Sequence, residues 1–264
     1  MQAEETGSLD EGKFYTSHGP HSNLGTIVLD SSVGTDIGPY EHRDFDIVRA
    51  GWPAINGAVY RDSFYTILNR RVLEGESPEE TTEARLAQVN VHTGKVKVLG
   101  SAISLNLGGL EISHCGEVFA TGFSLINALG GFYGDTNLYH VDRRDASLTL
   151  VGDTGLETIM DLAFDPEGTL WATVGNILYT LDTETGASTE IVTITGVESE
   201  KEIMGIAFTS TGEIFGTSPF VDGFYSIDLG SGVATKIGNH GLAFAHGGDI
   251  PMVPNDARCE GDDN

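Results

Sequence analysis

Five of the eight histidines fall near the two ends of the chain; they are His18, His21, His42, His240 and His246. Imidazole nitrogens that lie close together beside carboxylates suit a divalent transition metal such as zinc, copper, nickel or iron. Histidine is also the side chain whose ordinary pKa best suits proton exchange near neutral pH. The spacing His18-x-x-His21 is no metal motif by itself. Either chemistry therefore requires a fold that brings the two ends of the chain together.

The fold is indicated by one stretch that reads as four short strands in a row. Met160–Asp165, Thr169–Val174, Ile177–Asp182 and Ala187–Ile194 are separated by turns rich in Pro, Gly, Asp and Thr. Such turns between short apolar runs are typical of β-hairpins. A single four-stranded sheet leaves two edges and two faces exposed, so it requires neighbours.

Copies of this unit recur along the chain. The second strand, an aromatic segment after a turn, recurs after Gly12, Asp62, Gly116, Gly168 and Gly212. The third strand and its turn recur at Thr26–Gly34, Leu86–Gly94, Leu138–Ala146, Leu178–Gly186 and Phe224–Gly232. Five copies spaced about 40–60 residues apart predict the blades of a five-bladed β-propeller, an all-β fold.

The two ends of the chain complete one blade in this prediction. The amino end supplies strands two to four (Gly12–Ser17, Leu24–Asp30 and Val33–Ile37), and the carboxyl end supplies a first strand around Gly248–Met252. Pairing these ends closes the ring. A rival alignment, which places Leu242–Phe244 on the first strand, would duplicate a strand. An open β-sandwich of the same strands is the alternative architecture.

We expect one propeller domain over residues 11–253, between acidic tails at residues 1–10 and 254–264. There is no apolar run of transmembrane length and no signal peptide, and a leader is expected to have been removed ahead of the polar amino end.

One run has a wider resemblance. Leu178–Gly186 reads LYTLDTETG and resembles the blades of secreted bacterial β-propellers of the quinoprotein-like and NHL-like grouping, which read Leu-Tyr-x-Ile-Asp-x-x-Thr-Gly. The resemblance extends from Gly12 to Met252. It implies the architecture and an extracellular or periplasmic location. It implies no activity, because such propellers serve as enzymes, adhesins and scaffolds alike.

The chain is strongly acidic, with 39 Asp and Glu against 14 Lys and Arg and a formal net charge of −25. This charge argues against nucleic-acid and anionic-membrane partners. Most of the carboxylates are expected to solvate the surface, and we expect a monomer. Cys115 and Cys259 fall on the same face of the disc in this register. They either form a disulfide, as an oxidising compartment allows, or are two unrelated thiols.

The propeller prediction gathers the histidines. Loops from strand two to strand three, and from strand four to the next blade, share one face around the channel, where ligand sites usually lie. The five histidines occupy such loops in a single sector: His18, His21, His42, His240 and His246. A transition-metal site is the prediction that follows. A metal-free histidine site and scattered surface histidines are the alternatives.

Three carboxylates depart from the consensus of the repeat. Glu111 and Asp249 stand where Ala163 and Ala207 stand in other blades, and Asp161 stands where three blades have glycine. These positions are expected to pack near the channel, where an unpaired carboxylate is costly. Each carboxylate either serves a ligand site or accepts hydrogen bonds from backbone amides and pairs with arginine.

Three long loops reach the same face, at residues 38–53, 68–85 and 122–137, and the second is acidic with an expected short helix. The other two carry Tyr40, Trp52, Phe132 and Tyr133. Aromatic rings around an acidic pocket suit stacking against sugars. The same rings also anchor long loops onto the body of a protein.

Two functions follow. The first is a secreted propeller that binds a small ligand, glycan or transition metal through the histidine-rich site at the channel mouth. The second is an extracellular hydrolase or lyase that uses the same site, with His18, His246, Asp161, Glu111 and Asp249 as candidate catalytic residues. No Gly-x-Ser-x-Gly motif and no phosphate-binding loop is present.

Overall fold

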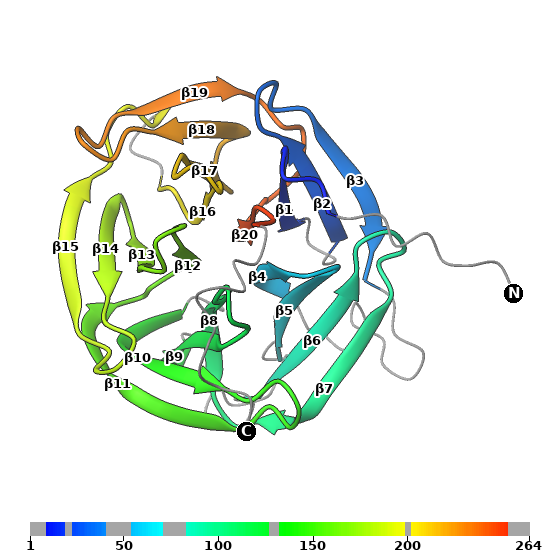
Figure 1. Cartoon of the computed structure of the whole chain (residues 1–264), viewed down its shortest axis with the longest axis vertical. Helices are drawn as coiled ribbons and strands as arrows, with labels where there is room; N and C mark the ends of the chain where they lie inside the picture. Colours follow the sequence, from blue (N-terminus) through cyan, green and yellow to red (C-terminus); the bar gives the residue numbers. More distant parts are fainter. Residues whose placement is uncertain are drawn as a thin grey trace, which may run out of the picture.

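The computed structural model describes residues 9–18, 23–40, 54–70, 83–126, 132–198 and 202–252. In these ranges the chain forms five antiparallel four-stranded sheets, arranged as blades around a central channel (Figure 1). The predicted five-bladed β-propeller is therefore confirmed. No helix in these ranges is long and apolar enough to cross a membrane.

The blades are numbered in chain order, and their strands are given from the channel outward. Blade I contains β20 (Gly248–Asp249), β1 (Lys13–His18), β2 (Asn23–Val28) and β3 (Gly34–Pro39). Blade II contains β4 (Ala54–Tyr60), β5 (Ser63–Asn69), β6 (Ala84–Asn90) and β7 (Val96–Ile103). Blade III contains β8 (Asn106–Ile112), β9 (Val118–Ile126), β10 (Phe132–Val141) and β11 (Leu148–Glu157). Blade IV contains β12 (Asp161–Phe164), β13 (Leu170–Val174), β14 (Ile177–Leu181) and β15 (Ser188–Thr193). Blade V contains β16 (Gly205–Phe208), β17 (Ile214–Ser218), β18 (Gly223–Ile227) and β19 (Ala234–Gly238).

The two ends of the chain close the ring in blade I, as predicted. Strand β20 pairs antiparallel with β1, with Asp249 opposite Tyr15 and Gly248 opposite Thr16. The rival alignment is excluded, because Leu242–Phe244 lie in the connection between β19 and β20.

The turns between the third and fourth strands are stabilised by side chains that accept hydrogen bonds from backbone amides. Asp182 Oδ1 accepts the amides of Glu184 and Thr185 at 2.9 and 2.8 Å. Gly186 follows with φ 81°, a left-handed conformation that favours glycine. Equivalent bonds form in other blades at Asn90, Asp142 and Asp228. The recurring Asp or Asn is therefore explained by the hairpin turn.

Blade III differs from its sequence interpretation. Residues 122–137 were expected to form a long loop, but β9 and β10 extend into this segment. Register shifts within β10 accommodate the longer strands. The helix expected within residues 68–85 and both expected tails fall largely or wholly outside the described ranges. Cys115 lies in the turn between β8 and β9, and Cys259 lies outside those ranges, so the disulfide stays a prediction.

The hydrophobic core lies between neighbouring blades. At the junction of blades V and I, the ring of Phe224 stacks on Phe215 with centroids 5.5 Å apart and meets Phe14 edge-on at 5.7 Å. Phe14 and Phe224 are fully buried. This aromatic group therefore joins a blade built from the two chain ends to its neighbour.

We predict that Phe14→Ala destabilises the protein by about 3–5 kcal/mol, because it removes a buried ring from this junction. Urea unfolding followed by circular dichroism measures the change. The control is Val33→Ala, at a side chain that is 57% exposed, which should stay within about 0.5 kcal/mol of the parent. Equal stabilities of the two variants would contradict the role of this junction.

Candidate functional site

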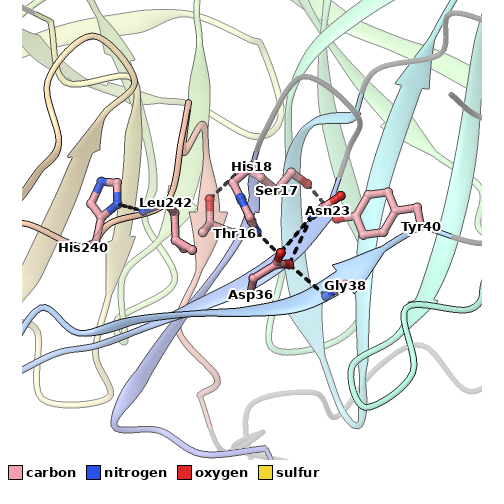
Figure 2. A network of polar contacts seen from close by, with 9 residues as sticks. All are labelled: Thr16, Ser17, His18, Asn23, Asp36, Gly38, Tyr40, His240 and Leu242. Atoms are coloured by element: carbon pink, nitrogen blue, oxygen red, sulfur yellow. Dashed lines mark hydrogen bonds and ion pairs between the residues drawn. The ribbon is translucent and has the colours of Figure 1, made fainter.

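His18 is the last residue of β1, and its ring crosses β2 to reach β3 (Figure 2). The crossing passes over Gly25, where a Cβ atom would lie 2.7 Å from His18 Cδ2. The Nε2 atom of His18 lies 3.3 Å from Asp36 Oδ1. Asn23 and the amide of Gly38 hold the Asp36 carboxylate through bonds of 2.9–3.2 Å. His18 is therefore a buried imidazole beside a half-exposed, fixed carboxylate.

His240 lies in the connection from β19 to β20. Its Nδ1 atom accepts the Leu242 amide at 3.0 Å. The Oδ1 atom of Asp222 accepts the amides of His240 and Gly241 at 2.9 and 2.8 Å, which fixes the loop. In Figure 2 the side chain of Leu242 lies between His240 and His18, and Leu242 also packs at the Gly25 position beside the His18 ring.

The backbone of His246 is hydrogen-bonded to blade I. Its amide donates to the Ser17 carbonyl at 3.1 Å. Its carbonyl accepts the hydroxyls of Thr16 and Thr217, each at 3.1 Å. The segment that carries His246 is therefore held between β1 and β17, in the same sector as His18.

The rings of the three histidines share one protonation state. Burial lowers the pKa of His18 and His240, and it lowers the pKa of His246 to about 4. All three rings are therefore neutral at pH 7. Two of the rings also have a buried nitrogen with no hydrogen-bond partner, His240 Nε2 and His246 Nδ1, whereas His18 Nε2 contacts the Asp36 carboxylate. We call these three residues the histidine sector.

The predicted metal site is not assembled within the described residues. His21 and His42 lie outside them. Among the described residues, no group of three or more His, Cys, Asp and Glu could hold a metal ion. The metal therefore stays a prediction that depends on His21 or His42.

Like the histidines, the aromatic residues predicted to contact a ligand lie partly inside and partly outside the described residues. Tyr40 is 3% exposed, and its hydroxyl bonds Ser17 Oγ at 2.8 Å, so its burial favours the anchoring role. Trp52 and the side chains of Phe132 and Tyr133 lie outside the described part of the chain.

Two aromatic residues of this face were missed by sequence reasoning. Phe220 and Phe244 are each 55% exposed. Phe220 lies two residues before Asp222, and Phe244 lies two residues after Leu242. Phe244 has φ 52°, an uncommon backbone conformation for an aromatic residue. The only sequence signal was their place in loops at the histidine sector.

The strand register places Glu111 and Asp249 as predicted, opposite the aromatic residues of second strands. Glu111 faces Phe119 and Asp249 faces Tyr15, as Ala163 faces Trp171 in blade IV. Both carboxyl groups are buried, with residue exposures of 2% and 5%. The internal comparison between blades therefore identified two buried acids.

Asp161 is the first residue of β12, at the end of the innermost strands away from Glu111 and Asp249. Its Oδ2 atom accepts the Ile206 amide at 2.9 Å, and the residue is 0% exposed. Asn56, which sequence reasoning missed, accepts the Gly247 amide at 3.0 Å and donates to the Met160 carbonyl. Blades I, II and IV thus meet at this end.

Glu111 and Asp249 lie toward the opposite face. They line a small depression, with a cavity volume of about 20 Å³, together with His114, which belongs to the turn between β8 and β9. The histidine sector lies at the end of the channel that Asp161 occupies. Glu111 and Asp249 therefore lie apart from the imidazoles of that sector, and their catalytic role stays a prediction.

Burial sets the state of these carboxyl groups. It raises the pKa of Asp161 well above its ordinary value, and it raises the pKa of Asp249 to about 7. Burial and then the charge of Asp249 raise the pKa of Glu111 well above its ordinary value. Glu111 and Asp161 are therefore largely protonated at neutral pH, and Asp249 is about half protonated.

No protein-family model matches the chain, and no curated protein sequence matches it. Solved structures are similar at the level of fold. A protein of unknown function from Bacteroides thetaiotaomicron VPI-5482 is 12% identical over 93% of this chain and 62% of that chain, with a TM-score of 0.54. A chain of a nidogen/laminin complex is 11% identical over 91% of this chain and 98% of that chain, with a TM-score of 0.50.

A third similar structure is a protein of unknown function from Bacteroides caccae, 10% identical over 84% of this chain and 71% of that chain, with a TM-score of 0.47. A puromycin hydrolase and a streptogramin B lyase also match, with TM-scores of 0.47 and 0.42. The likenesses with TM-scores of 0.54 and 0.50 concern the fold alone, and a β-propeller carries many activities.

We predict that Gly25→Ala displaces His18 and costs about 1–3 kcal/mol, because the new methyl group would overlap the imidazole and Leu242. Thermal unfolding and the imidazole NMR signals report the two effects. Gly230→Ala is the control, because its Cβ atom would make an ordinary 3.5 Å contact. Unchanged imidazole signals in Gly25→Ala would contradict the crossing geometry.

We predict that Glu111→Ala gains stability relative to the parent as the pH rises from 4 to 8. A carboxyl group whose pKa is raised by folding lowers the free energy of unfolding as the pH rises above the pKa that the group has in the unfolded chain. Because alanine does not titrate, the variant does not lose this free energy. One unit of pKa corresponds to about 1.4 kcal/mol. Urea unfolding at both pH values tests the prediction, and a pH-independent difference between the two proteins would contradict it.

Proposed function

We propose that this protein is a secreted binding propeller that holds a small glycan at the histidine sector, without turnover. The observation that supports this proposal is the pair of buried imidazole nitrogens, on His240 and His246, that have no hydrogen-bond partner in one sector. A buried polar atom without a partner costs about 1–3 kcal/mol. Ligand groups that pair with such atoms would recover this free energy.

The protonation of His240 favours an oxygen-bearing ligand over a metal ion. Its Nδ1 atom accepts the Leu242 amide, so the proton of the neutral ring resides on Nε2. An N–H group donates to a hydroxyl or carbonyl oxygen and cannot ligate a cation. His18 and His246 are neutral as well, and a neutral imidazole both donates and accepts hydrogen bonds. Sugar hydroxyls have the matching capacity.

The neighbouring side chains supply the other contacts that a sugar uses. Phe220 and Phe244 present rings that are each 55% exposed, and apolar sugar faces pack against such rings. The side chains of Asp36 and Asp222 are 53% and 43% exposed and offer carboxylate oxygens to hydroxyl groups. Phe220 and Asp222 belong to the connection between β17 and β18, and Phe244 shares the connection between β19 and β20 with His240 and His246. Asp36 lies on β3 beside His18.

Binding is favoured over hydrolysis or lyase chemistry by the arrangement of the titratable groups. A general acid or base must reach the reacting atom within hydrogen-bond distance. Glu111 and Asp249 lie toward the other end of the channel, and Asp161 is fully buried. The acids expected to assist the histidines are therefore not positioned to do so.

We predict that the full chain binds a subset of an arrayed glycan library, and that Phe220→Ala/Phe244→Ala weakens the binding by at least about tenfold, or 1.4 kcal/mol. Calorimetry with the best glycan of the array measures the affinity. The control, Leu150→Ala/Val33→Ala, removes two apolar side chains that are 58% and 57% exposed elsewhere and should bind like the parent.

Two results would contradict this proposal. The first is the absence of glycan binding, or equal binding by the Phe220/Phe244 variant and the parent. The second is near-stoichiometric zinc, copper, nickel or iron in protein purified without chelator, lost in His18→Ala/His240→Ala. That second result would establish the metal site instead.

A further inference from the structure

One position of the innermost strand separates the blades into two groups. Its residue faces an aromatic residue of the second strand in every blade. Alanine occupies it in blades II, IV and V, as Ala58, Ala163 and Ala207, each 0% exposed. Glu111 and Asp249 occupy it in blades III and I. Alanine is therefore sufficient for the fold at this position, and the two acids require another explanation.

Asp249 belongs to the strand that closes the ring. Strand β20 has two residues and pairs with β1 opposite Tyr15 and Thr16. The Asp249 side chain adds a bond to the next blade, because its Oδ2 atom accepts the Val59 amide of blade II at 2.8 Å. Its Oδ1 atom accepts the Ile250 amide at 2.7 Å. This carboxyl group is therefore part of the attachment of the carboxyl end of the chain to the ring.

Glu111 of blade III lines the same small cavity as Asp249, and we call these two residues the carboxyl pair. Both residues are buried, and Glu111 Oε1 accepts the Ile112 amide at 2.7 Å. Glu111 Oε2 is buried without a hydrogen-bond partner. The cavity volume of about 20 Å³ has room for about one water molecule. A negative charge on either group would therefore be almost unhydrated.

The cations around this cavity do not neutralise the carboxyl pair. Arg61, in the turn between β4 and β5, and Arg143 lie over the ring of Tyr60, 5.3 and 4.6 Å from its centroid. His114, in the turn between β8 and β9, bonds a backbone carbonyl of blade IV at 3.2 Å. Within the described part of the chain no ion pair joins the carboxyl pair to a cation.

The strands packed around the carboxyl pair add a further acid. Asp161 of β12 contributes to the raised pKa of Glu111. Tyr15 of β1 lies opposite β20, and burial raises the pKa of its hydroxyl, while Lys13 of the same strand pairs with Asp10. Strands β9 and β16 contain no titratable residue, and β4 and β5 contain only tyrosines. Ionisation of the pair would therefore place unbalanced negative charge inside the fold.

We propose that the carboxyl pair is a pH-dependent latch on ring closure, which holds β20 in place when protonated and releases β20 from blade II when it ionises. Release lets water reach both carboxylates, so the open state ionises where the closed state resists ionisation. The open state therefore gains population as the pH rises. The latch does not depend on the proposed glycan site, because the histidine sector lies toward the opposite end of the channel.

The direction of the effect follows from burial. Burial raises the pKa of Asp249 to about 7 and that of Glu111 well above its ordinary value, whereas solvated carboxyl groups have pKa values of about 4. Between these limits opening releases protons, and each released proton raises the opening equilibrium constant about tenfold per pH unit. Asp249 alone therefore predicts a rise of about fiftyfold between pH 5 and pH 7.

Amide hydrogen–deuterium exchange of the full chain at pH 5 and pH 7, corrected for the intrinsic exchange rates, tests the latch. The amides of Val59 and Ile250, which donate to Asp249, should lose protection by at least about fiftyfold between these pH values. At pH 7 they should be at least about tenfold less protected than the best-protected amides of β14, because opening leaves blade IV folded.

Neutral variants test whether the carboxyl pair causes this change. Glu111→Gln/Asp249→Asn keeps the amide acceptors, and the protection of Val59 and Ile250 should then change by less than about fivefold between pH 5 and pH 7. Glu111→Ala places the residue of three other blades at this position and should fold, with a change at least about threefold smaller than in the parent. Glu117→Gln, at an exposed carboxylate of the adjacent turn, is the matched control and should behave like the parent.

Three results would overturn the proposal. Protection of Val59 and Ile250 equal to that of β14 at both pH values would show that the ring opens only by complete unfolding. Protection that is independent of pH in the parent would exclude a titrating latch. A change in both carboxyl-pair variants as large as in the parent would assign the pH dependence to other groups.

Discussion

The stability of the ring depends on which groups accept hydrogen bonds from the backbone amides at the channel-side edge of the innermost strands. These strands have no sheet neighbour on the channel side, and a buried amide without a partner is costly. Asp249 of blade I accepts the Val59 amide of blade II, and Asp161 of blade IV accepts the Ile206 amide of blade V. Each carboxyl group therefore joins two blades across a junction that backbone pairing does not bridge. The closing strand β20, two residues long, supplies one of these bonds.

These hydrogen bonds between blades require carboxyl groups that are buried from water. Burial raises the pKa of Asp161 well above its ordinary value and that of Asp249 to about 7. Asp161 therefore accepts its amide hydrogen bond as a largely protonated group at neutral pH, and Asp249 as one that is about half protonated. The structural role accounts for one oxygen of Asp161 and one of Glu111, while Asp161 Oδ1 and Glu111 Oε2 have no partner. One carboxyl group can thus serve the fold with one oxygen and remain available to a ligand with the other.

The fold could be predicted because strand lengths and turn residues are local signals that repeat. The repeat also provided an internal reference, which identified Glu111 and Asp249 without any second sequence. Asn56 was missed because a register shift between Ala54 and Gly57 interrupts the comparison in β4. The end of the channel toward which Glu111 lies was not predicted, because it depends on how far along its strand the residue is placed. Side-chain directions, such as Leu242 between two histidines, follow from packing that spacing does not encode.

The two ends of the channel respond to pH in opposite directions. Burial lowers the pKa of His246 to about 4, so the unfolded chain binds more protons there, and this contribution to stability is lost as the pH falls from about 6.5 toward 4. Burial raises the pKa of Asp249 to about 7, so its contribution is lost as the pH rises from about 4 toward 7. The two effects oppose each other over the same window. A ligand that fixes the charge at one end would leave the other end uncompensated, so the pH dependence of stability should become steeper when only one end is occupied.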